Sequence, residues 1–202
     1  MSATSDRFFV LTGGPGSGKT TLIEALGAAG FPTSVEAGRA IIRDQSAIGG
    51  PALPWSDPAA FAELMLSWEM RSYAIASAAS SPVFFDRGVP DVVGYLRLTG
   101  LPVPAHIEKA AEVFRYNRKA FILPPWAEIF SQDTERRQSF AEARRTFDAM
   151  AETYARFGYE LISVPTGPIA ERMEFICKQT GFGTGLPKDT ESAKCGLRRP
   201  QA

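Results

Sequence analysis

Residues 8–22 read FFVLTGGPGSGKTTL, and this stretch decides the fold. Its first four residues form a continuous apolar run, which is typical of a strand buried on both faces within a parallel sheet. A glycine-rich turn follows, after which apolar residues recur at helical spacing until Gly30 and Pro32 end the pattern. The stretch therefore predicts a buried strand, a tight loop and a helix.

The loop matches the pattern GxxxxGK[ST] in full, between the predicted strand and the predicted helix. In such a loop the backbone amides surround the phosphates, Lys19 reaches the β- and γ-phosphates, and Thr20 offers its hydroxyl to Mg²⁺. An incidental glycine turn would not be expected to carry the whole motif in this setting. We therefore expect ATP or GTP to bind here with Mg²⁺. The residues expected to bind the nucleotide are Gly13, Gly14, Pro15, Gly16, Ser17, Gly18, Lys19, Thr20 and Thr21.

A second apolar run, residues 83–85, ends in a carboxylate at Asp86. In P-loop enzymes an aspartate at the end of a neighbouring strand binds Mg²⁺ through water, so we expect Asp86 to face Thr20. A plain turn or a helix-capping aspartate is the competing interpretation. The next residue, Arg87, either anchors an oxygen or phosphate of an acceptor or is a solvated or ion-paired arginine, and the sequence leaves this open.

Strand-like and helical segments alternate along the rest of the chain. Further strands are predicted near 33–35, 120–123 and 161–164. Helices are predicted at 37–44, from Asp57 to near Ser80, at 91–98, at 104–114, in a segment ending near Gly158, and at 168–179. The alternation predicts a three-layer α/β fold, with a five-stranded parallel sheet and helices on both faces, in which ligands bind at the carboxyl ends of the strands.

Length and composition limit the domain organisation. With 202 residues, of which 45% are hydrophobic, the chain can bury one sizeable core, and we assign a single domain to residues 1–180. Residues 181–202 are rich in Gly, Lys, Pro and polar groups without periodicity, which predicts a disordered tail.

Charge and cysteine content argue against several classes of protein. The 22 basic residues equal the 22 acidic ones, so no overall field favours binding to nucleic acid or to an anionic membrane. No apolar stretch approaches the length of a membrane span. The two cysteines form no metal or disulfide framework, which predicts a cytoplasmic protein. A lone His106 supports neither a metal site nor a nucleophilic site, and the sequence does not give the oligomeric state.

From Phe8 to about Gln179 the sequence resembles the AAA_28 group of P-loop ATPases, whose relatives include the nicotinamide-riboside-kinase domain of bacterial NAD-biosynthesis regulators. Four stretches carry the resemblance, which are LTGGPGSGKTTL, VEAGRAII, FFDRGVPDVVGYL and QDTERRQSF. The resemblance implies a nucleotide-kinase-like P-loop sheet with the Asp86 strand beside the first strand. It also implies that Glu36 faces the acceptor and that Arg136 or Arg137 lies in a lid, about 132–145, over the phosphates.

Physical reasoning supports these implied roles but leaves alternatives. Glu36 at a strand end can accept a hydroxyl proton or hold Mg²⁺ through water, or it can be a helix-capping or surface residue. Arg39, three residues on, either orients Glu36 or binds the substrate. Lid arginines would stabilise charge on a transferring phosphoryl group, although a charge-laced solvated helix would look similar. Aromatic residues that could stack on a base, but for most of which core packing is expected, are Trp55, Phe61, Trp68 and Tyr73.

The leading functional hypothesis is ATP- and Mg²⁺-dependent phosphoryl transfer to a small molecule of the nucleoside or nucleotide class. The expected catalytic residues are Lys19, Glu36, Asp86, Arg136 and Arg137, with Glu36, Arg39 and Arg87 on the substrate. The alternative is a regulatory ATPase or GTPase switch without an acceptor. Residues 123–126 read LPPW where a dedicated GTPase would carry an NKxD-like tetrapeptide, which weighs against that class. The identity of the acceptor and the preference for ATP or GTP stay open.

Overall fold

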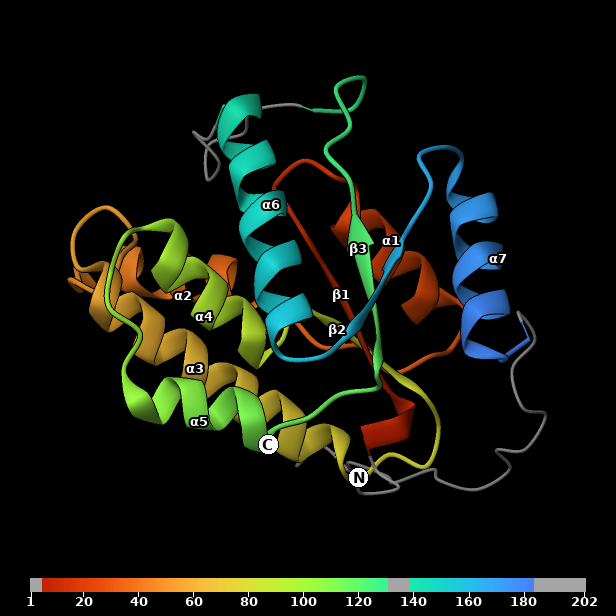
Figure 1. Cartoon of the computed structure of the whole chain (residues 1–202), viewed down its shortest axis with the longest axis horizontal. Helices are drawn as coiled ribbons and strands as arrows, with labels where there is room; N and C mark the ends of the chain where they lie inside the picture. The colour runs from red at the N-terminus through yellow and green to blue at the C-terminus, as the bar shows by residue number, and fades with distance from the viewer. Residues whose placement is uncertain (1–4, 131–138, 184–202) are drawn as a thin grey trace, which may run out of the picture.

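The computed structural model describes residues 5–130 and 139–183. Its sheet contains the strands β1 (Phe8–Gly13), β2 (Val83–Asp86), β3 (Lys119–Leu123) and β4 (Glu160–Ser163). All pairings are parallel, in the order β2-β1-β3-β4, so β1 and β3 are central (Figure 1). Parallel neighbours need crossover connections, which the intervening helices provide.

The prediction of five strands was wrong for the described residues, where the sheet has four. The predicted strand at 33–35 is reduced to one bridge between Thr33 and Phe84, flanked by two backbone hydrogen bonds, Ser34 N to Phe84 O and Phe84 N to Pro32 O. Proline has no N–H to donate, so a ladder cannot extend through Pro32. The segment nevertheless runs beside β2 and delivers Glu36 to the carboxyl end of the sheet.

The predicted helices are all present with shifted ends. They are α1 (Lys19–Ala28), α2 (Ala37–Ile48), α3 (Pro58–Ala76), α4 (Val89–Leu98), α5 (Ala105–Val113), α6 (Phe140–Arg156) and α7 (Ile169–Thr180), with a 3-10 turn at Ser5–Arg7. Asp57 is the N-cap of α3, since its carboxylate accepts from Ala60 N at 2.9 Å. The helix predicted to end at 44 continues to Ile48, where Gly49 ends it in a left-handed conformation.

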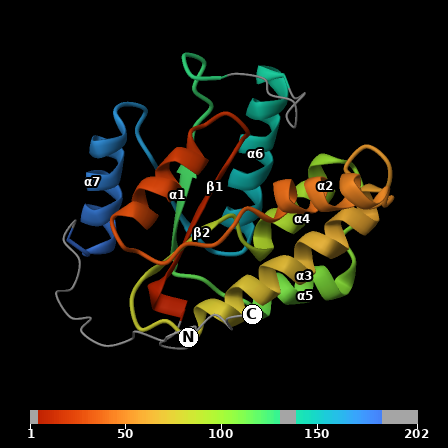
Figure 2. The same cartoon turned by 180° about the vertical axis from the view of Figure 1, so that it is seen from behind.

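Helices cover both faces of the sheet, as predicted (Figures 1 and 2). On one face α1 and α7 bury a cluster that includes Phe9, Leu11 and Ile176. On the other face Phe8 and Val10 lie in a cluster with Tyr154 of α6 and with Tyr116 and Tyr159, which precede β3 and β4. This alternation along β1 follows from the two-residue period of a strand and explains why the run 8–11 is apolar throughout.

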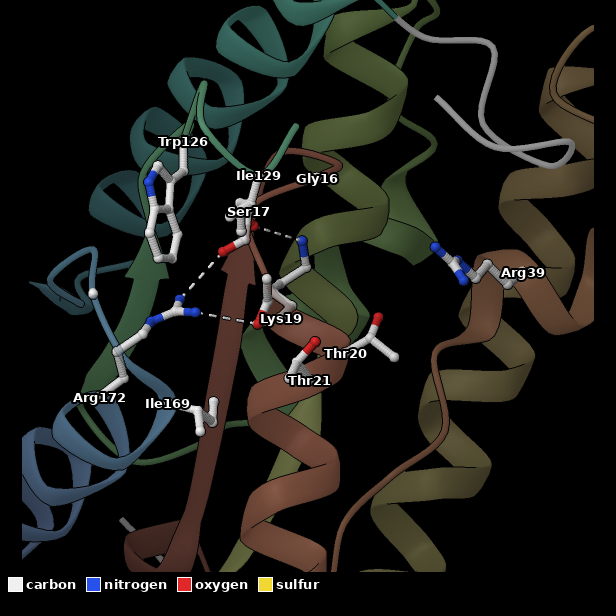
Figure 3. Close-up of a pocket in the computed structure, with 12 residues that line it drawn as sticks. Gly16, Ser17, Lys19, Thr20, Thr21, Arg39, Trp126, Ile129, Ile169 and Arg172 are labelled. Atoms are coloured by element: carbon white, nitrogen blue, oxygen red, sulfur yellow. Dashed lines mark hydrogen bonds between the residues drawn. The ribbon is translucent and has the colours of Figure 1, made fainter. Parts of the chain in front are cut away.

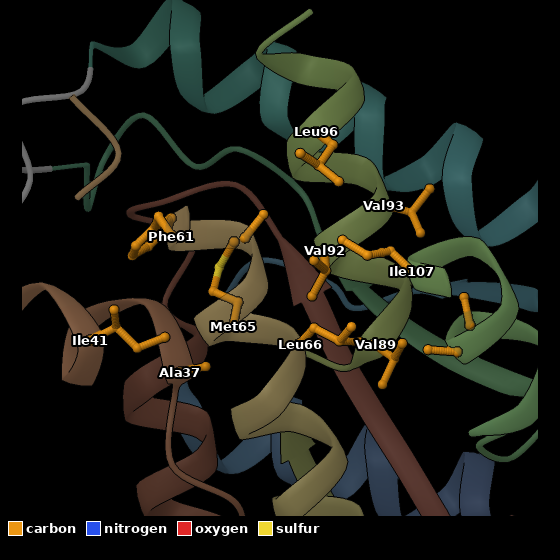
Figure 4. Close-up of a cluster of buried hydrophobic side chains, with 13 residues drawn as sticks. Ala37, Ile41, Phe61, Met65, Leu66, Val89, Val92, Val93, Leu96 and Ile107 are labelled. Atoms are coloured by element: carbon orange, nitrogen blue, oxygen red, sulfur yellow. The ribbon is translucent and has the colours of Figure 1, made fainter. Parts of the chain in front are cut away.

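A further apolar cluster joins α2, α3, α4 and α5 beside the sheet (Figure 4). Phe61 lies in it and Trp68 packs against it, while the Tyr73 hydroxyl donates to Arg115 O at 2.8 Å, so core positions are confirmed for these residues. Trp55 is different, because 67% of its surface is exposed. Within the residues that the structure describes, no helix is long and apolar enough to cross a membrane.

Only the first residues of the predicted tail are described, and the rest of it, 184–202, lies outside the described residues. Gly181 ends α7 in a left-handed conformation. The ring of Phe182 then packs edge-on against Phe9, with 6.1 Å between centroids. Contacts with the domain therefore reach at least Phe182, two residues beyond the predicted boundary at 180.

Candidate functional site

The loop from Gly13 to Thr20 connects β1 to α1 with a backbone that only glycine accommodates at several points. Gly18, the N-cap of α1, has a φ of 76°, which side-chain-bearing residues rarely adopt. A Cβ on Gly14 would clash with the backbone of Ala143 on α6. The loop therefore exposes backbone amides at the N-terminus of a helix, which is the arrangement that attracts phosphate.

Lys19 lies inside this loop, with 4% of its surface exposed. Its ammonium donates to Gly14 O at 2.8 Å and to Gly13 O at 3.1 Å. Ser17 Oγ also donates to Gly14 O, at 2.9 Å. Carbonyl groups of the loop thus hold the Lys19 ammonium in place. The motif assigns the β- and γ-phosphates to the position next to this charge.

Arg172 on α7 fixes the other side of the loop, and no motif in the sequence points to it. Its guanidinium donates to Ser17 O at 3.2 Å and to Gly18 O at 3.4 Å (Figure 3). In a trans peptide the carbonyl and the following N–H point in opposite directions. Holding these two carbonyls toward α7 therefore turns the amides of Gly18 and Lys19 away from α7, which keeps them available for an anion.

Asp86 ends β2 directly beside β1, where it pairs in register with Leu11. The side chain is buried, and among the described residues its Oδ1 has no hydrogen-bond partner. Burial, and then the charge of Glu36, raise the pKa of Asp86 to about 6, against the opposing charges of Lys19 and Arg87. Asp86 and Thr20 line one cavity. An unpaired carboxylate oxygen beside a hydroxyl is a donor set that suits Mg²⁺.

Glu36 is held between two arginines. The residue precedes α2 as its N-cap, and its carboxylate lies 3.3 Å from Arg39 Nε and 3.5 Å from Arg87 Nε. The orienting contact between Arg39 and Glu36 that the spacing predicts is therefore present. Both partners are basic, so they attract the carboxylate and fix its direction at the edge of the Asp86 cavity.

Arg87 is ion-paired on both sides. Its Nη1 donates to Asp91 Oδ1 at 3.1 Å, and its backbone adopts a φ of 73°. A non-glycine residue in that region stores backbone strain, of order 1–3 kcal/mol, that the surrounding contacts must offset. Arg87 is therefore ion-paired in the structure, and its expected contact with an acceptor stays a prediction.

Asp91 is the hub of this network, and motif reasoning did not single it out. Its carboxylate accepts from Thr12 Oγ1 at 2.6 Å, from the Tyr154 hydroxyl at 2.6 Å and from Gly88 N at 3.0 Å. These donors come from β1, α6 and the turn after β2. One buried carboxylate therefore ties together three elements that surround the loop.

Glu69 on α3 is the second buried acid that sequence reasoning missed. Only 2% of its surface is exposed, and burial, followed by the charges of Asp91 and Asp86, raises its pKa well above the ordinary value. A signal was present, because Glu69 falls at helical spacing from Met65 and Leu66 on the apolar face of α3.

The predicted lid is only partly described. Arg136 and Arg137 lie outside the described residues. The end of the segment forms the start of α6, where Ser139 and Glu142 make a reciprocal capping box. The charged pattern near 142–145 therefore belongs to a helix terminus, while the lid role of the two arginines stays a prediction.

A comparison with protein families matches residues 8–172 to AAA_28, described as an AAA domain. The chain belongs to the AAA_28 family. No curated protein sequence matches this AAA_28 chain. The family assignment confirms the resemblance expected from the sequence.

Solved structures with the same fold include NadR in complex with NR, at 17% identity and a TM-score of 0.65, over 91% of this AAA_28 chain and 54% of that one. Deoxyadenosine kinase from M. mycoides follows with 12% identity and a TM-score of 0.62, over 86% and 98%. Thymidylate kinase from Ehrlichia chaffeensis has 16% identity and a TM-score of 0.57, over 88% and 100%. The chain spans about half the length of the NadR proteins. At these identities the likeness shows the fold alone, a P-loop kinase-like α/β fold.

Proposed function

We propose that this protein is an ATP- and Mg²⁺-dependent kinase that transfers the terminal phosphoryl group to a small molecule of the nucleoside or nucleotide class. One observation carries the proposal, namely that two cavities meet beside the loop. The first, of about 430 Å³, covers residues 16–21, and the second, of about 420 Å³, contains Glu36 and Asp86. Thr20 and Arg39 line both cavities.

Two adjoining cavities suit a reaction between two substrates. The first cavity runs over the N-terminal turn of α1, from Arg39 on one side to Trp126 and Arg172 on the other (Figure 3). A nucleotide bound there would point its terminal phosphate toward Thr20 and the second cavity. An acceptor in the second cavity would then lie against that phosphate. A switch that only binds and hydrolyses a nucleotide has no need of the second cavity.

The donor side would act through position and charge. The loop amides and Lys19 would hold the phosphates, and Thr20 and Asp86 would hold Mg²⁺. When bound, Mg²⁺ neutralises charge that develops on the phosphate oxygens. The unpaired Oδ1 of Asp86 supports this assignment, since a buried carboxylate oxygen without a donor is unfavourable until a cation or a proton occupies it.

The acceptor side would be organised by Glu36. An acceptor hydroxyl would donate to its carboxylate while the acceptor oxygen forms a bond to the γ-phosphorus and the bond to the β–γ bridging oxygen breaks. The hydroxyl proton would pass to Glu36 or to the transferred group. Because this transfer has a loose transition state, the direction in which the Glu36 carboxylate holds the acceptor hydroxyl matters more than the basicity of that carboxylate. The two arginines that hold Glu36 would supply that direction. Arg39 lines both cavities, and Arg136 or Arg137 would close over the phosphates.

An acceptor screen tests the proposal. ATP and Mg²⁺ are supplied with nicotinamide riboside, ribonucleosides, deoxynucleosides and their monophosphates, while ADP release and a mass gain of one phosphoryl group are followed. A true acceptor should raise ADP release well above the background with water, because it completes the site. Glu36→Gln should abolish that turnover while ATP still binds. Glu112→Gln serves as the matched control, because the Glu112 side chain is exposed on α5. If no acceptor gains mass while the nucleotide binds tightly, the kinase proposal fails and a regulatory switch takes its place.

A further inference from the structure

The first cavity extends beyond the loop to a wall on the side of β3 and α7. Trp126, after β3, and Arg172, on α7, form this wall together with Ile129 and Ile169 (Figure 3). The Arg172 guanidinium carbon lies 5.5 Å from the centre of the Trp126 ring. A planar cation over an indole ring is a favourable pair, so each side chain holds the other in place.

We propose that Trp126 and Arg172 form a stacking platform for the nucleobase of the phosphoryl donor, and that this platform accepts adenine and guanine with little discrimination. The inference rests on the proposed function in that it names the donor side of the same site. Phosphates held by the loop leave the base to extend along the cavity. The wall of Trp126 and Arg172 offers flat surfaces on which a base can stack, between two isoleucine side chains.

The lack of base selectivity follows from the side chains around the platform. Guanine presents N–H donors on the edge where adenine presents an unprotonated ring nitrogen, so a site that reads guanine usually supplies a carboxylate or amide oxygen. Among the described residues lining this cavity there is no acidic side chain and no amide side chain. The terminal nitrogens of Arg172 already donate to Ser17 and Gly18. Stacking alone tolerates any base, because every base has a π-face.

Trp126 is the residue to change, because Arg172 also holds the loop. We would titrate ATP, GTP and inorganic tripolyphosphate, each with Mg²⁺, into the protein and into Trp126→Ala, following heat release. Trp126→Ala should weaken ATP and GTP by about 10-fold and leave tripolyphosphate unchanged, since tripolyphosphate has no base to stack. Trp126→Phe, which keeps an aromatic face, should retain most of the affinity. Trp55→Ala is the matched control, because Trp55 is exposed and lines neither cavity.

The unchanged protein should bind ATP and GTP within about 10-fold of each other, as expected for stacking without edge contacts. The platform is overturned if Trp126→Ala weakens tripolyphosphate as much as ATP, because Trp126 would then support the loop and not the base. Unchanged ATP affinity in Trp126→Ala, or a preference between ATP and GTP above about 100-fold, would also overturn it. These titrations contain no acceptor. Base-dependent binding without phosphorylation of any acceptor would therefore support the platform while the kinase proposal fails.

Discussion

Thr12 on β1 donates a 2.6 Å hydrogen bond to the carboxylate of Asp91 on α4, 79 residues further along the chain. The bond joins the strand that leads into the phosphate-binding loop to the helix that follows Asp86 and Arg87. Because Asp91 also pairs with Arg87, the same carboxylate sets the position of both halves of the site. Loss of the Asp91 carboxylate should therefore disturb the position of residues on both sides of the site.

Asp91→Ala should lower the free energy of unfolding by about 3–5 kcal/mol, because it leaves the Arg87 charge buried without its closest partner. Urea denaturation followed by circular dichroism measures the change. Asp148→Ala, at an exposed position on α6, should stay within about 0.5 kcal/mol of the unchanged protein. Equal stabilities for the two variants would show that Asp91 is not the hub of the network.

Lys19→Ala should weaken ATP binding by about 10- to 100-fold, as expected for the loss of hydrogen bonds from a charged group. The fold should survive, because the neighbouring contacts of the ammonium are loop carbonyls and not core side chains. Calorimetric titration measures the affinity, and a thermal melt shows whether the variant is folded. Lys109→Ala is the control, because the Lys109 side chain is exposed on α5. Unchanged ATP affinity in folded Lys19→Ala would contradict the assignment.

Asp86→Asn should leave metal-free nucleotide binding largely intact and remove the gain in affinity that Mg²⁺ gives. The reason is that the carboxylate with the unpaired oxygen is replaced by an amide that binds cations poorly. Titrations of ATP with Mg²⁺ and with EDTA separate the two effects. A variant that still responds to Mg²⁺ would transfer the ligand role to another carboxylate, with Glu36 in the same cavity as the first candidate.

Glu69→Gln should stabilise the protein at pH 8 and change its stability little near pH 4.5. The folded state raises the pKa of Glu69 above its ordinary value of 4.5, so the folded state holds the proton more tightly than the unfolded state. That contribution to stability is present below the unfolded pKa and is lost as the pH rises through the folded pKa. Glutamine resembles the neutral form of Glu69 and does not titrate, so Glu69→Gln does not lose this stability as the pH rises.

Urea denaturation of both proteins at the two pH values checks this prediction about Glu69. Glu112→Gln, exposed on α5, should show no gap that grows with pH. A gap for Glu69→Gln of the same size at both pH values would mean that Glu69 does not titrate between the folded and unfolded states.

Deletion of residues 184–202 should leave the melting temperature and ATP affinity almost unchanged. Those residues are poor in apolar side chains, so they could offset little of the entropy of ordering. Deletion from Phe182 onward should lower the melting temperature slightly further, because it removes the ring that packs against Phe9. Differential scanning calorimetry of both truncations distinguishes the cases. A large drop for the shorter deletion would show that the tail stabilises the domain.

The local sequence was enough to predict the phosphate-binding loop, the Asp86 strand and the alternation of strands and helices. Each depends on residues close together in the chain, such as an apolar run, a glycine turn or a cap. The strand at 33–35 was predicted wrongly because the local sequence could not show that its ladder stops after one bridge. The end of α2 was placed too early because residues 46–48 are exposed, so no buried face marks the last turn of this helix.

Only the tertiary structure decided which distant groups complete the site. Arg172 reaches Ser17 and Gly18 across separations of 155 and 154 residues, and this contact requires the sheet order that places α7 beside α1. Asp91 and Glu69 likewise acquire their environment from α3, α4 and α6 packing over the other face of the sheet. The sequence by itself thus determined the glycine-rich loop between β1 and α1, since its backbone geometry depends on residues close together in the chain. The folded chain decided which cavities lie beside that loop, since those surfaces form only when elements far apart in the sequence meet.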